Sequence, residues 1–216
     1  AAILPDMTLL KDLGCPDVVY DDTSRLAEAD LFAPISRRPR LGDDEWAGYG
    51  KRLTGLAERM AGFGVGMAFH HHMGTIVETD AEVDRLMAVT GPAVGLLYDT
   101  GHSAFSGGDP VALLQRHVKR VVHVHCKDAR KDLLDKARAK DESFMQAVLD
   151  GVFTVPGDGF IDYPRILGML HDAGYAGWLV CEAEQDPGKA HPLTYARLGF
   201  SNLVRMALQA GFTVSP

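Results

Sequence analysis

The sequence predicts an α/β protein with a parallel β-sheet, and three observations lead to this fold class. Short apolar runs rich in β-branched residues alternate along the chain with amphipathic helical patterns. The apolar runs are nearly continuous, as expected for strands that are covered on both faces. Polar residues end most of these runs, and the carboxyl ends of parallel strands are where such sheets and barrels build their sites.

The strands are predicted first, because the helices are then placed in the segments between them. They are expected at residues 16–22, 65–71, 93–100, 121–128 and 177–184. The segment before residue 15 is predicted as the end of a helix that leads into the first of these strands.

Helices are predicted between the strands from spacing and capping residues. In the segment 44–64, Leu53, Leu56, Ala57 and Met60 share one helical face. Capping signals begin two more helices: Thr79 with Glu82 is a capping box, and Asp109 precedes Pro110. The remaining helices are expected at 79–91, 109–120, 141–151, 163–174 and 191–212, with a turn in "VPGDG" at 155–159.

Composition and charge restrict the class of protein. The chain has 216 residues, of which 46% are hydrophobic, which is enough for one domain over residues 1–216. The net charge of −7 argues against a nucleic-acid partner. The sequence shows neither an apolar run of about 18 residues nor a secretory signal, so no membrane association is expected. Cys15, Cys126 and Cys181 lack CxxC spacing and are interpreted as reduced thiols of a cytoplasmic protein.

Histidines and carboxylates gather at the predicted strand ends. In "FHHHMGT" (69–75), His70 and His72 share one face, while His71 points the other way and is expected to be structural. Other strand ends carry Asp99, the pair His123 and His125, and Glu182. Mixed nitrogen and oxygen donors suit Mn²⁺, Co²⁺, Fe²⁺ or Zn²⁺.

Each candidate also has a structural explanation. Asp99 could cap the following turn, one of the two histidines at 123 and 125 could belong to the core, and "VPGDG" could be a simple turn. Glu78 taken alone is typical of a solvated first-turn acid, and Glu184 is the alternative to Glu182 on the same face. One functional and two incidental histidines in the run is the corresponding alternative for residues 70–72.

The motifs "DTGHSAFSGGDP", "HVHCKD", "VPGDGFIDY" and "GWLVCEAEQDP" resemble those of the xylose-isomerase-like TIM barrels, which include sugar isomerases, epimerases and dehydratases. Within that superfamily, "FHHHMGT", "GVFTVPGDG" and "EAEQDPGKAHPLTYA" together resemble the inosose dehydratases. The resemblance covers the chain from about residue 45 onward.

The resemblance implies an eight-stranded (β/α)₈ barrel with a metal ion at its carboxyl-end face. Carried over by motif, the metal ligands are Glu78, Asp99, His125 and Glu182, with His72 as the alternative to Glu78. The resemblance favours His125 over His123, because the ligand is usually the second histidine of an HxH pair.

The implied reaction is dehydration of scyllo-inosose (2-keto-myo-inositol), a small polyol ketone, to 3D-trihydroxycyclohexane-1,2-dione and water through an enediolate, in myo-inositol catabolism. Mn²⁺ or Co²⁺ is the expected cofactor, with Zn²⁺, Fe²⁺ or Mg²⁺ as alternatives. The base is Glu182 or Glu78. The remaining catalytic candidates are His70, His72, His102 and Lys127. An isomerase or epimerase of the same superfamily, or a non-catalytic barrel that keeps its metal, are the alternatives.

The number of predicted strands departs from a complete barrel. Such a barrel has eight strands in about 250 residues, whereas five strands are predicted here, so the first three β/α units are expected to be absent. An open sheet would expose apolar surface, which a second chain in a homo-oligomer would cover.

Overall fold

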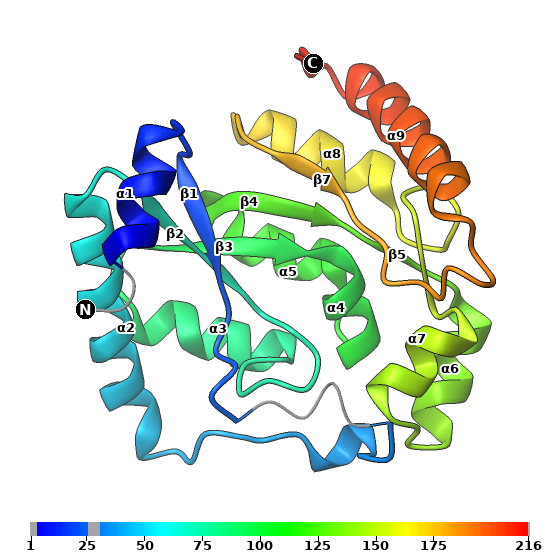
Figure 1. Ribbon diagram of the computed structural model, residues 1–216, viewed down its shortest axis with the longest axis horizontal. Helices are drawn as coiled ribbons and strands as arrows, with labels where there is room; N and C mark the ends of the chain where they lie inside the picture. Colours follow the sequence, from blue (N-terminus) through cyan, green and yellow to red (C-terminus); the bar gives the residue numbers. More distant parts are fainter. Residues whose placement is uncertain (1–3, 26–30, 216) are drawn as a thin grey trace.

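The computed structural model describes residues 4–25 and 31–215. Within these ranges five strands form one parallel sheet, and all five predicted strands are confirmed. They are β1 (Asp17–Tyr20), β2 (Gly66–His70), β3 (Val94–Asp99), β4 (Val121–Cys126) and β7 (Leu179–Cys181), in the order β1-β2-β3-β4-β7. Among these five strands, each one pairs with the strand that comes before it along the chain, as in the wall of a barrel (Figure 1).

Strand register brings the polar strand ends together. His70 pairs with Leu97, and Asp99 pairs with His125 on the neighbouring strand. Cys126 pairs with Cys181 across β4 and β7. A bulge between Leu96 and Leu97 shifts the register within β3 and β4, so that Asp99 and His125 are adjacent.

Helices follow the strands as the sequence predicts. The predicted segments contain α2 (Glu45–Gly62), α3 (Asp80–Val89), α5 (Pro110–His117), α7 (Phe144–Asp150), α8 (Tyr163–Asp172) and α9 (Pro192–Gln209). The capping box of Thr79 and Glu82 is present, and Asp109 accepts hydrogen bonds from the first turn of α5. The helix expected before the first strand is α1 (Leu4–Asp12).

Several short elements were not predicted. They are η1 (Ile35–Arg37), α4 (Thr100–Ser106), η2 (Val118–Arg120), β5 (Asp128–Ala129), α6 (Lys131–Ala139) and β6 (Phe153–Thr154). β5 and β6 pair antiparallel in a separate two-stranded sheet. All five strands are also shorter than predicted. In particular, β4 ends at Cys126 and β7 ends at Cys181, so Glu182 and Glu184 lie in the segment after β7.

One face of the sheet carries the hydrophobic core under the helices. Phe69, Leu96, Tyr98 and Val124 are at most 1% exposed and belong to one buried cluster with the helices. Because side chains alternate along a strand, the neighbouring residues point to the opposite face.

The opposite face is concave. His123 on β4 lies 3.1 Å from the carboxylate of Asp17 on β1, although β2 and β3 separate these strands. Two side chains meet across two intervening strands only if the sheet curves strongly, as a barrel wall does.

The two edge strands leave apolar surface exposed, as expected for an open sheet. Val19 in β1 is 43% exposed, and Trp178, next to β7, is 62% exposed. In the described part of the chain, every helix is too short or too polar to cross a membrane. The three cysteines are free thiols, and only Cys126 is fully buried.

Candidate metal centre and its catalytic residues

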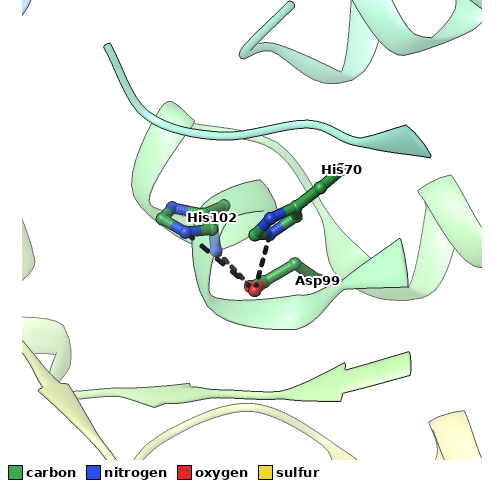
Figure 2. A group of neighbouring side chains, drawn as sticks. All are labelled: His70, Asp99 and His102. Carbon is green, nitrogen blue, oxygen red and sulfur yellow. Dashed lines mark hydrogen bonds and ion pairs between the residues drawn. The ribbon is translucent and has the colours of Figure 1, made fainter. Parts of the chain in front are cut away.

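Asp99 is the centre of the polar cluster at the carboxyl end of the sheet. Its side chain is fully buried at the end of β3. Oδ2 lies 3.3 Å from Nε2 of His70, 3.5 Å from Nδ1 of His125 and 3.6 Å from Nζ of Lys127. Figure 2 shows His70 and His102 converging on this carboxylate from two different elements. Oδ1 accepts a hydrogen bond from the backbone N–H of His102, so Asp99 also caps α4.

The buried Asp99 carboxylate is ionised. Burial alone would raise the pKa of Asp99, but the Lys127 ammonium beside it outweighs burial and holds that pKa well below its usual value. The cluster therefore contains a permanent negative charge inside the protein, which is the first requirement of a cation site.

His125 and Glu182 face each other beside Asp99. Nδ1 of His125 lies 2.9 Å from Oε2 of Glu182, yet within the described ranges neither buried atom has a hydrogen-bond partner of acceptable alignment. Burial alone would lower the pKa of His125, but the carboxylates of Asp99 and Glu182 outweigh it and raise this pKa to about 9. An imidazole and a carboxylate held this close, without a well-aligned hydrogen bond, fit two ligands of one ion, which would take the place of the imidazole proton.

The donor atoms of Asp99, His125 and Glu182 all lie within 4.8 Å of one another. Mixed imidazole and carboxylate donors in this spacing suit a divalent ion such as Mn²⁺, Co²⁺, Fe²⁺ or Zn²⁺. Asp99 also belongs to an overlapping group with His70 and His102, whose donor atoms lie equally close together. The residues present thus fit a divalent metal ion, with His70 next to the first group.

The histidine run divides as its alternation predicts. The rings of His70 and His72 are 5.2 Å apart between centroids, on the side of Asp99. His71 is fully buried, and its Nε2 accepts a hydrogen bond from the backbone N–H of Asp99. Burial lowers the pKa of His71 to about 3, so this imidazole is neutral and supports the strand end of β3.

Lys127, His102 and Glu184 extend the cluster beyond Asp99. Nζ of Lys127 lies 2.8 Å from Glu184, 3.2 Å from Glu182 and 2.9 Å from Nε2 of His102. Burial alone would lower the pKa of Lys127, but Asp99 and Glu184 outweigh it and raise this pKa, so the amine is charged. Burial, together with Lys127, lowers the pKa of His102, which is neutral.

Glu78 is not brought to this cluster. Its carboxylate lies 3.0 Å from Nε of Arg38 and accepts a hydrogen bond from the backbone N–H of Gly74. No group of metal-like donors among the described residues includes Glu78. The loop after β2 turns away from the sheet at Gly74, where φ is 78°, and carries Glu78 against the segment that holds Arg38. His72, the alternative predicted in place of Glu78, lies with His102 and Glu184, whereas His70, at the end of β2, contacts Asp99.

His123 also lies outside the site, because it pairs with Asp17 on the concave face. The structure brings together Asp99, His125 and Glu182, which the sequence analysis proposed as ligands, whereas Arg38 as the partner of Glu78 was not predicted. No local pattern signals that pair, since the two residues are distant in sequence and their segments meet only in the fold.

Asp128 explains the turn-rich segment after β6. Its carboxylate accepts hydrogen bonds from the backbone N–H groups of Gly157, Gly159 and Ile161, and also of Ala129. The "VPGDG" turn is therefore tied to the residue that directly follows Lys127. This contact fixes the loop beside the site.

A parallel barrel wall with a carboxylate and imidazole cluster at its carboxyl edge is the arrangement of an α/β-barrel enzyme whose residues fit a divalent metal ion. Residues 2–203 match the family model described as xylose isomerase-like TIM barrel, and the chain belongs to this family.

Relatives of known description agree with this family. The chain is 67% identical over 99% of its length to the rhizopine catabolism protein MocC of Rhizobium meliloti, of which it covers 66%. It is 46% identical over 88% of its length to the inosose dehydratase of Lactiplantibacillus plantarum, of which it covers 64%. The chain thus spans about two thirds of the length of these curated relatives.

Solved structures show the same fold at low sequence identity. A crystal structure of the IolI protein with a bound zinc atom matches 98% of this chain and 71% of its own, with a TM-score of 0.68 and 18% identity. A fusion protein of a xylose isomerase-like TIM barrel with 4-hydroxyphenylpyruvate dioxygenase matches 97% of this chain and 30% of its own, with a TM-score of 0.69 and 22% identity.

Proposed function

We propose that this chain carries the metal and catalytic residues of an inosose dehydratase, a carbon–oxygen lyase of inositol catabolism. The substrate is scyllo-inosose and the products are 3D-trihydroxycyclohexane-1,2-dione and water. The observation that carries the proposal is the cluster of Asp99, His125 and Glu182 in a chain 46% identical to a named inosose dehydratase.

Asp99, His125 and Glu182 are proposed to hold the divalent ion, with His70 as the fourth ligand in place of Glu78. His70 contacts Asp99 directly, whereas Glu78 is occupied by Arg38. The ion when bound supplies Lewis-acid polarisation of the substrate ketone, which acidifies the neighbouring C–H bond. Mn²⁺ or Co²⁺ is the proposed ion.

Exposure separates residues that reach the substrate from residues that act through others. The side chains of Glu182 and Glu184 are 32% and 29% exposed, and that of His72 is 12% exposed. His102 and Lys127 are fully buried. Further chain packed onto this site would only reduce exposure, so His102 and Lys127 are proposed as positioning residues rather than substrate contacts.

The proton transfers follow from this division. Glu182 is proposed as the base, because a carboxylate has two oxygens and Glu182 directs only Oε2 at His125. It removes the proton on the carbon next to the ketone, which gives an enediolate. His72, across the site beside Glu184, is proposed to protonate the departing β-hydroxyl so that it leaves as water.

The proposal includes the setting of the enzyme. Residues 1–216 are proposed to form one barrel domain with a small polyol ketone as its substrate. The three cysteines are free thiols, although Cys126 and Cys181 lie side by side on paired strands. Free thiols in this position are consistent with the reducing cytoplasm.

The 67% identity to a protein named for rhizopine catabolism supports a second candidate, in which the same site serves that route. The name gives a pathway and no reaction. Supplying purified protein with scyllo-inosose and, separately, with rhizopine distinguishes the two candidates by which compound is consumed.

The test of the proposal is dione formation from scyllo-inosose by the Mn²⁺-loaded protein. Loss of dione formation in Asp99→Ala and His125→Ala is expected, with retention in His123→Ala, which changes a histidine outside the site. A rearranged ketone instead of the dione would identify an isomerase or epimerase, because only dehydration removes the hydroxyl. Metal binding without any product would contradict the catalytic assignment for this chain.

A further inference from the structure

A second group of donors lies beside the proposed metal site and shares no residue with it. Nε2 of His72 is 3.8 Å from Oε1 of Glu184, and Nε2 of His102 is 3.8 Å from Oε2 of Glu184. One donor atom from each of these three residues lies within 4.8 Å of the other two. This spacing matches that of the group formed by Asp99, His125 and Glu182.

The His72 ring is already oriented as a ligand would be. Its Nδ1 lies 2.8 Å from the backbone carbonyl oxygen of Met73, which can only accept, so Nδ1 carries the proton and donates it. In the neutral imidazole the lone pair is then on Nε2, which faces Glu184, and the same atom carries the proton in the imidazolium form that is proposed to act as the acid. A hydrogen bond from the other ring nitrogen to a backbone carbonyl is how metal-binding histidines are commonly held.

Lys127 occupies the space between the two donor groups. Its Nζ lies 2.8 Å from Oε2 of Glu184 and 2.9 Å from Nε2 of His102 in the second group. It also lies 3.2 Å from Glu182 and 3.6 Å from Asp99 in the first group. The ammonium thus uses donor atoms that a second cation would need.

Charge gives the same answer as geometry. The carboxylates of Asp99, Glu182 and Glu184 carry three negative charges at this edge of the sheet. One divalent ion and one ammonium balance them. A second divalent ion beside the ammonium would leave two uncompensated positive charges, whereas with a neutral residue at position 127 two divalent ions leave only one. Such charge is costly away from water.

The lysine is fixed in this place. A Cβ added at Gly101 would come within 2.6 Å of Cγ of Lys127, so the backbone of α4 lies directly on the lysine stem. Nζ is also 5.1 Å from the centre of the Phe153 ring. The stem is therefore held against α4, and the ammonium lies over the Phe153 ring.

We propose that the Lys127 ammonium takes the place of a second divalent cation, and that His72, His102 and Glu184 form a latent metal site which opens when Lys127 is replaced by a neutral residue. The inference rests on the proposed function, in which Asp99, His125 and Glu182 bind the first ion. Lys127 thereby keeps the centre mononuclear.

Metal stoichiometry of Lys127→Met tests this inference, because methionine keeps the length of the stem and removes the charge. The full chain is titrated with Mn²⁺ by calorimetry, and the electron paramagnetic resonance signal is recorded at each step. One equivalent is expected for the wild type and two for Lys127→Met. The second ion should weaken the signal per ion, because two Mn²⁺ ions this close are magnetically coupled.

The double variant Lys127→Met with Glu184→Gln is the matched control and should return to one equivalent. One equivalent in both the wild type and Lys127→Met overturns the inference and leaves the proposed metal site intact. A wild type that binds no ion contradicts the proposed metal site instead. Circular dichroism checks folding, and Lys127→Gln replaces Lys127→Met if the latter is unfolded.

Discussion

Nδ1 of His125 lies 2.9 Å from Oε2 of Glu182, and in the described structure neither of these two buried atoms has a well-aligned hydrogen-bond partner. His125 is the second-to-last residue of β4, and Glu182 directly follows β7, the next strand in the sheet. The backbone N–H of Glu182 donates to the carbonyl of Cys126, which fixes the position of Glu182 beside β4. Two donors held together in this way by the backbone form a preorganised pair for a cation.

His70→Ala is expected to weaken Mn²⁺ binding by about 10–100-fold, the range seen when a close support of a metal site is lost. His70 contacts Asp99 within the cluster. Calorimetric titration measures the affinity. His123→Ala is the matched control, because His123 is a buried histidine of similar exposure that pairs with Asp17 instead. Equal affinity in the wild type and His70→Ala would remove His70 from the ligand set.

Glu78 gives a prediction for the pH dependence of stability. Burial raises the pKa of Glu78 to about 7, against the opposing charge of Arg38. A folded-state pKa above the unfolded one contributes stability at low pH that is lost as the pH rises through about 7. The wild type is therefore expected to lose as much as about 3 kcal/mol, relative to Glu78→Gln, between pH 4.5 and pH 7.

Urea unfolding of the wild type and Glu78→Gln at a series of pH values measures this difference. A difference that stays constant across the range would show that Arg38 keeps Glu78 ionised throughout. The same variant should bind Mn²⁺ like the wild type, because Glu78 lies with Arg38 and not with Asp99. Loss of the ion in Glu78→Gln would restore Glu78 as a ligand.

Asp128→Ala is expected to destabilise the fold by about 3–5 kcal/mol, because it leaves several buried N–H groups without an acceptor. Asp128 is fully buried and accepts from Gly157, Gly159 and Ile161. Asp158→Ala, which removes a more exposed acid of the same loop, should cost about 1 kcal/mol or less. Thermal and urea unfolding measure both, and similar losses in the two variants would contradict this role of Asp128.

The packing of α2 on α3 gives a prediction that is independent of the metal site. A Cβ at Gly50 would overlap the carbonyl oxygen of Val89 at the end of α3, so Gly50→Ala should destabilise by about 1–3 kcal/mol. At Gly55, on the same helix, a Cβ meets only the end of the flexible Arg59 side chain. Gly55→Ala should therefore stabilise by about 0.5–1 kcal/mol. Unfolding midpoints should therefore shift in opposite directions in the two variants. Stabilisation by Gly50→Ala would contradict the close packing of α2 on α3.

The strands and their polar ends were predictable because burial on both faces leaves a local pattern. Continuous apolar runs locate β2, β3 and β4, and the polar residue that ends each run then falls at one edge of the sheet. Asp99 and His125 follow directly from this rule, since neighbouring parallel strands end together. The helices α4 and α6 were missed because α4 is short and α6 has only Leu134 and Ala137 buried.

The remaining features depend on contacts between distant segments. The family resemblance implied Glu78 as a ligand, but in the fold its carboxylate pairs with Arg38 from a distant segment. Lys127 is a catalytic candidate in sequence, but its burial depends on α4, on Phe153 and on the segment after the neighbouring strand β7, which carries Glu182 and Glu184. The spacing of apolar and polar residues along the chain does not predict contacts between such distant segments.

Mn²⁺ titration of the wild type, Asp99→Ala and His125→Ala, followed by electron paramagnetic resonance, tests the central claim most directly. One bound ion per wild-type chain, lost in both variants while circular dichroism shows them folded, is the predicted result. Wild-type stoichiometry in either folded variant would show that the cluster around Asp99 is not the metal centre.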